Sequence, residues 1–129
     1  MKKIIKCLLI DDDTDDRDFF SLAINHLDAE IQLDYSPSGE HALHYLEPGA
    51  NTPDYIFLDL NMMPMSGIET LTEIKKIASC VDIPVIIYST TINETIKYKT
   101  LALGAFDHFV KPSSKVELEA YLKRLLQVH

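Results

Sequence analysis

Short apolar runs alternate along the chain with segments whose apolar residues recur at helical spacing. The runs cover residues 4–10, 31–35, 55–58, 84–88 and 106–110. Those at 55–58 and 84–88 are apolar throughout, which is typical of strands covered on both faces. The run at 31–35 alternates apolar and polar residues, as a half-buried strand does. The pattern therefore predicts five strands.

The intervening segments predict helices at about 14–27, 36–46, 67–78, 92–103 and from 114 onward. In the first of these, apolar residues 20, 23, 24 and 27 form one helical face. Pro37 is expected in the first turn of the second helix, and Glu47-Pro48-Gly49 at its end. Gly104 fits the position just after the fourth helix. Ser114 and Glu117 have the spacing of a capping box for the last.

Five strands alternating with five helices predict an α/β fold, a doubly wound (βα)5 sandwich with a parallel sheet covered on both faces. Ligands of such sheets bind at the carboxyl ends of the strands, near the point where the strand order reverses. Candidate chemistry is therefore expected just after Ile10, Leu58, Tyr88 and Val110.

Composition narrows the choice of partners. The 129 residues, 47% of them hydrophobic, fit one domain over 1–129 with a real core. Twelve basic against twenty acidic residues give a net charge of −8, which disfavours nucleic acid and anionic membranes. The densest basic stretch, Lys2, Lys3 and Lys6, is short, and no run fits a signal peptide or a membrane span. A cytoplasmic protein with reduced Cys7 and Cys80 is expected.

Polar residues follow four of the predicted strands. Asp11 and Asp12 come after the first, Asp59 after the third, Ser89 after the fourth and Lys111 after the fifth. Three carboxylates converging on one edge repel one another unless a cation lies between them. Oxygen ligands without Cys or His favour a hard ion, Mg²⁺ or alternatively Mn²⁺. A lysine and a hydroxyl would complete a phosphate site, where a carboxylate can serve as nucleophile.

These residues resemble the receiver domains of two-component response regulators, in particular the single-domain chemotaxis type. The resemblance rests on LLIDDDTDDR, FLDLNMMPMSG, the serine of VIIYST and the lysine-proline of HFVKP, each at the end of its own strand. It covers essentially the whole chain. It implies a flavodoxin-like fold with strand order 2-1-3-4-5.

The resemblance also implies residue roles. Asp59 would be the phosphoacceptor, and the chain would catalyse its own phosphorylation and dephosphorylation rather than act as an enzyme on other substrates. Asp12 and Asp59 would bind the metal directly, with the backbone carbonyl of Asn61, and Asp11 would bind it through water. Lys111 and Ser89 would bond the phosphoryl oxygens. Lys111-Pro112 would be a cis peptide.

Two positions depart from the family pattern. The proline usually found four residues after the acceptor is replaced by Met63, and Pro64 follows one residue later, while Gly67 keeps the usual loop length. His108 stands at the aromatic switch position, where an imidazole can also titrate near neutral pH. Among the other acidic residues, Asp13 is expected to cap the first helix. Asp15, Asp16 and Asp18 are expected only to complement that helix or its solvated face.

Two other functions compete. A haloacid-dehalogenase-type phosphatase also uses a strand-end aspartate with Mg²⁺, but its DxDxT pattern would need threonine at position 15, which is Asp15. A pseudo-receiver would be an interaction module without phosphorylation, yet none of the key residues is missing.

The resemblance also indicates the partners. The donor would be a histidine kinase or a histidine phosphotransfer protein. Because no output domain follows the fifth helix in this sequence, we expect the signal to pass to a separate target protein or a second copy. The surface expected to carry it is formed by the fourth helix, fifth strand and fifth helix.

Overall fold

The structure, a computed structural model, describes residues 3–48 and 50–129, so Lys2 and Gly49 lie outside the described residues. Its strands are β1 (Ile5–Ile10), β2 (Ile31–Ser36), β3 (Tyr55–Leu58), β4 (Val85–Ser89) and β5 (Asp107–Val110). They pair in parallel in the order β2-β1-β3-β4-β5. The predicted fold class and strand order are confirmed.

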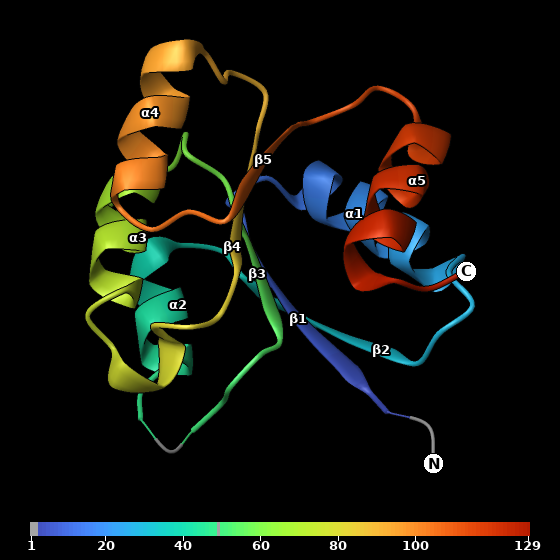
Figure 1. Cartoon of the computed structure of the whole chain (residues 1–129), viewed down its shortest axis with the longest axis horizontal. Helices are drawn as coiled ribbons and strands as arrows, with labels where there is room; N and C mark the ends of the chain where they lie inside the picture. The colour runs from blue at the N-terminus through green and yellow to red at the C-terminus, as the bar shows by residue number, and fades with distance from the viewer. Residues whose placement is uncertain (1–2, 49) are drawn as a thin grey trace.

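Helices cover both faces of this sheet (Figure 1). They are α1 (Thr14–Asn25), α2 (Gly39–Tyr45), α3 (Gly67–Ile74), α4 (Glu94–Ala102) and α5 (Lys115–Leu126), with a short 3₁₀ turn η1 (Ala78–Cys80). α1 and α5 lie on one face, and α2, α3 and α4 lie on the other. The result is a three-layer sandwich.

The continuous apolar strands divide their side chains between two cores. In β1, Leu8 and Ile10 pack in the cluster that includes α2 and α3, whereas Cys7 and Leu9 pack with α1 and α5. All four are essentially inaccessible to water. Successive side chains of a strand point to opposite faces, so a strand between two helix layers must be apolar at every position.

Local capping chemistry moved the start of α2 and the position of the capping box from their predicted places. α2 begins at Gly39 because the Ser38 hydroxyl accepts the His41 N–H at 3.1 Å, so Pro37 precedes the helix and its predicted place in the first turn is wrong. Ser114 does cap α5 by accepting the Glu117 N–H, at 3.4 Å. The reciprocal capping box is formed instead by Ser66 and Glu69 at the start of α3.

Two other predictions about the backbone had different outcomes. Gly104 follows α4 with φ of 104°, a left-handed conformation that glycine adopts readily, as predicted. The predicted cis peptide at Lys111–Pro112 is wrong, because among the described residues the cis bond is Met63–Pro64. Cis and trans X–Pro bonds differ by only about 0.5–1 kcal/mol, so the surroundings of each proline decide its isomer and the motif alone does not.

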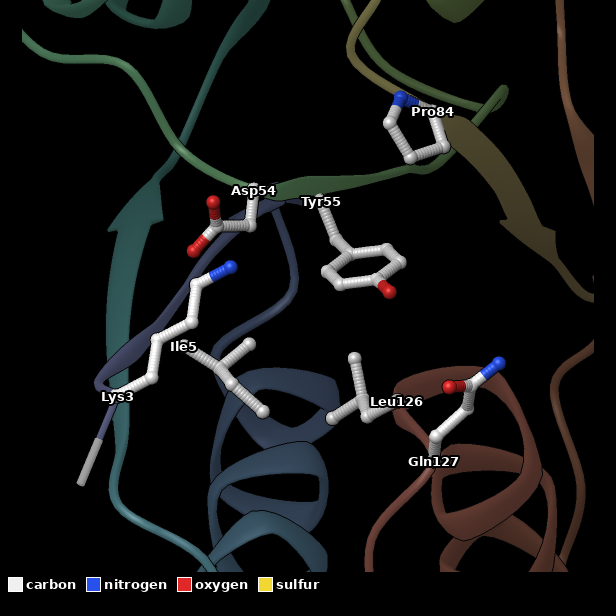
Figure 2. A pocket seen from close by; sticks show the side chains of 7 residues that line it. All are labelled: Lys3, Ile5, Asp54, Tyr55, Pro84, Leu126 and Gln127. Atoms are coloured by element: carbon white, nitrogen blue, oxygen red, sulfur yellow. The ribbon is translucent and has the colours of Figure 1, made fainter. Parts of the chain in front are cut away.

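A pocket of about 440 Å³ opens at the edge of the sheet where the strands begin (Figure 2). Ile5 and Tyr55, the first residues of β1 and β3, line it together with Leu126 at the end of α5. It therefore lies at the opposite end of the strands from Asp11 and Asp59. Among the described residues, no helix has the length and hydropathy needed to cross a membrane.

Candidate phosphoryl and metal site

Asp11 and Asp59 lie side by side because they continue neighbouring strands. The Asp11 N–H donates to the Ser36 carbonyl at 3.1 Å, and the Asp59 N–H donates to the Ile10 carbonyl at 3.0 Å. The sheet ladder therefore extends one residue past each strand and brings both carboxylates to its carboxyl edge. Asp11 is fully buried and Asp59 is 4% exposed.

Asp12 completes a group of three carboxylates. One oxygen from each of Asp11, Asp12 and Asp59 lies within 4.8 Å of the others, with Asp12 on the exposed side. The buried Asp11 Oδ2 accepts no hydrogen bond from the described residues. Three carboxylate oxygens this close together, with no Cys or His among them, fit a hard divalent cation such as Mg²⁺.

Lys111 enters the same cluster from the end of β5. Its backbone N–H donates to the Ser89 carbonyl at 2.9 Å, which directs the side chain over the carboxyl edge. The ammonium lies 2.8 Å from Asp11 Oδ2, outside hydrogen-bonding geometry, and 3.5 Å from Asp59 Oδ2. It donates a hydrogen bond to Asp16 Oδ2 at 2.6 Å. Three carboxylates thus surround one cation.

Burial and these contacts shift two pKa values in the site. Burial raises the pKa of Asp11 to about 6, against the opposing effect of Lys111 and with a further rise from the Asp59 charge. Burial alone would lower the pKa of Lys111, but Asp11, Asp16 and Asp59 raise it above its ordinary value. The lysine is therefore a permanent cation at neutral pH.

Ser89 and Asn61 complete the polar edge. The Asn61 side-chain amide donates to Ser89 Oγ at 3.3 Å, and the Asn61 backbone N–H donates to Asp59 Oδ1 at 3.3 Å. Ser89 is fully buried, and its hydroxyl proton is not used in a hydrogen bond to any other described residue. That proton is available to an acceptor placed beside Asp59.

His108 lies on β5 and connects it to α4. Its Nε2 is 2.6 Å from the Thr100 hydroxyl, which itself donates to the Ile96 carbonyl at 2.8 Å. The tautomer of the imidazole decides which of the two groups donates this bond. Burial lowers the pKa of His108, which favours the neutral imidazole.

The structure brings Asp11, Asp12, Asp59, Ser89 and Lys111 together as the sequence predicts. Asp13 caps α1 by accepting the Asp15 and Asp16 N–H groups, also as predicted. The interpretation of Asp16 as a residue that only complements the helix is wrong, because its carboxylate pairs with a lysine 95 positions away. No local pattern signals a contact of that range.

A doubly wound parallel sheet with an acidic cluster and a lysine at its carboxyl edge defines an α/β protein built to hold a cation and an anionic group. Consistent with this class, the sequence model of the response regulator receiver domain matches residues 7–123. The chain belongs to the response-regulator receiver-domain family. Members of this family in general accept a phosphoryl group on an aspartate and bind Mg²⁺. The family assignment argues against the phosphatase alternative.

Two curated relatives match nearly the whole chain. The two-component response regulator-like protein PRR37 of Oryza sativa subsp. indica is 36% identical over 118 residues, 92% of this chain and 16% of its own length. The phosphate regulon transcriptional regulatory protein PhoB of Pseudomonas aeruginosa is 32% identical over 120 residues, 93% of this chain and 51% of its own length. The chain therefore spans only part of these relatives.

Solved structures of single receiver domains match more fully. The phosphorylated cyanobacterial phytochrome response regulator RcpA has a TM-score of 0.85 and 27% identity, with 97% of this chain and 93% of that chain covered. The chemotaxis protein CheY4 of Vibrio cholerae has a TM-score of 0.81 and 25% identity, with 98% and 100% covered.

Proposed function

We propose that Asp59 accepts a phosphoryl group from a phosphohistidine donor and that the protein signals through altered contacts with other proteins. The observation that carries the proposal is the position of Asp59, which shares the carboxyl edge of the sheet with Asp11, Asp12 and the Lys111 ammonium. The family membership and the phosphorylated state of the similar RcpA support it.

In this reaction an Asp59 carboxylate oxygen attacks phosphorus, and the new P–O bond forms as the P–N bond to the donor imidazole breaks. Lys111 and the Ser89 hydroxyl would bond the phosphoryl oxygens, which their closeness to Asp59 and Asn61 supports. Asp12, Asp59 and the Asn61 carbonyl would hold Mg²⁺ directly, and Asp11 through water. The ion would supply positive charge to the transferring phosphoryl group.

Lys111 and Ser89 also connect the site to the surface formed by α4, β5 and α5. If Lys111 and Ser89 turn toward a phosphoryl group, the loop after β4 moves, and His108 can change rotamer only by leaving Thr100. Exposed apolar side chains already lie beside this connection: Tyr98 is 83% exposed, Leu101 52% and Phe106 62%. We propose that α4, β5 and α5 contact a separate target or a second copy of the chain.

The experiment is phosphoryl transfer from acetyl phosphate, followed by intact mass. With Mg²⁺ the wild type is expected to gain one phosphoryl group, and with EDTA to gain almost none. Asp59→Asn should not be labelled, whereas Asp82→Asn, which alters an exposed carboxylate away from the site, should be labelled like the wild type. Equal labelling of Asp59→Asn and the wild type would contradict the proposal.

A further inference from the structure

Asp16 makes a contact that the receiver reaction does not require. It stands in the first turn of α1, and its Oδ2 lies 2.6 Å from Lys111 Nζ, the shortest of the three carboxylate contacts of that ammonium. The Asp16 side chain is 33% exposed, and that of Lys111 is 8% exposed. A partly exposed residue therefore holds the buried cation of the site.

The backbone around α1 explains why the Asp16 carboxylate is free to do this. In a capping box, the side chain at the third helical position bonds the N–H of the capping residue. Here the Asp13 N–H donates to Asp11 Oδ1 at 3.0 Å instead. Because that N–H is already bonded, the Asp16 carboxylate is left to bond the Lys111 ammonium.

We propose that Asp16 is a positioning residue that holds Lys111 in the unphosphorylated site and competes with a phosphoryl group on Asp59 for it. The inference rests on the proposed function. A lysine ammonium has three N–H donors, and the best-directed one in this structure points at Asp16. Nζ lies 2.6 Å from Asp16 Oδ2 and 3.5 Å from Asp59 Oδ2, so moving the ammonium toward a phosphoryl group on Asp59 weakens the hydrogen bond to Asp16.

The charges around Lys111 also favour competition between Asp16 and a phosphoryl group. Asp11, Asp16 and Asp59 already share one ammonium, and a phosphorylated Asp59 carries about 1.5–2 negative charges at neutral pH in place of the single charge of its carboxylate. Removing the Asp16 charge leaves Lys111 with fewer competing partners. Asp16 thus lowers the affinity of the site for a phosphoryl group, while Lys111 itself increases it.

The first arm of the test examines the contact without metal or phosphoryl mimic. The ¹⁵N–¹H resonance of the Lys111 ammonium, assigned with Lys111→Met, reports how fast its protons exchange with water. Asp16→Asn should accelerate this exchange about fivefold, whereas Asp15→Asn, which removes the same charge one residue away, should leave it unchanged. Equal exchange in the wild type and Asp16→Asn would overturn the proposal.

The second arm measures the competition by titrating beryllofluoride at saturating Mg²⁺ and following bound fluoride by ¹⁹F NMR. Asp16→Asn should bind about fivefold more tightly than the wild type and than Asp15→Asn. Unchanged or weaker binding, or equal tightening in both variants, would overturn the competition. If neither the wild type nor the variants bind beryllofluoride, the proposed function fails and this inference fails with it, whatever the first arm shows.

Discussion

At the scale of single residues, Asp11 has the most unusual environment in the site. Its carboxyl group is fully buried, and burial raises its pKa from 3.8 to about 6 despite the neighbouring Lys111. Between these two values the folded state binds more protons at Asp11 than the unfolded chain does. The contribution of Asp11 to stability therefore falls as pH rises through this window in the metal-free protein.

This predicts a pH-dependent difference between the wild type and Asp11→Asn, measured by urea unfolding in EDTA. The free energy of unfolding of the wild type, relative to the variant, should fall by ~2 kcal/mol between about pH 4 and pH 7. The variant is the control because all other carboxyl groups are common to both proteins. A difference that stays constant over this range would show that Asp11 does not titrate as its burial implies.

The sequence could predict which residues form the site but not all of their contacts. Asp11, Asp59, Ser89 and Lys111 each follow a strand, and parallel strands end at the same edge, so their convergence follows from the apolar pattern. Whether Asp16 in α1 reaches Lys111 depends on the distance between α1 and the end of β5. Only the folded structure supplies that distance.

At the scale of elements, the start of α3 is fixed by a close backbone approach. A Cβ added to Gly67 would lie 2.2 Å from the Asp59 carbonyl oxygen and 2.5 Å from Leu60 Cα. Both obstacles are backbone atoms, which cannot turn aside as a flexible side chain can. Glycine at this position therefore lets α3 pack directly against the segment that carries the phosphoacceptor.

Gly67→Ala is accordingly expected to lower the free energy of unfolding by about 2 kcal/mol, since the loop after β3 must shift to admit the methyl group. The same shift should displace Asp59 and slow labelling by acetyl phosphate. Equilibrium urea unfolding checks the first effect and the initial rate of mass gain checks the second. A change in stability below about 0.5 kcal/mol would contradict the close approach.

At the scale of the whole molecule, the three-layer fold could be predicted because β1, β3 and β4 are apolar at nearly every position. A strand of that kind is stable only between two helix layers. The helix starts were harder to predict, since Ser38 and Pro37 compete for the same turn and the serine hydroxyl determines the start. The isomer of Lys111–Pro112 could not be predicted, because both isomers fit the sequence there.

The central claim is that Asp59, the carboxylate at the end of β3, alone becomes an acyl phosphate. Phosphorylate the wild type with acetyl phosphate and Mg²⁺, and treat it with borohydride, which reduces an aspartyl phosphate to homoserine. Tandem mass spectrometry then identifies the reduced position without any substitution. The account predicts homoserine at position 59, with Asp11, Asp12 and Asp16 unmodified. Homoserine at one of those positions, or none at position 59, would contradict it.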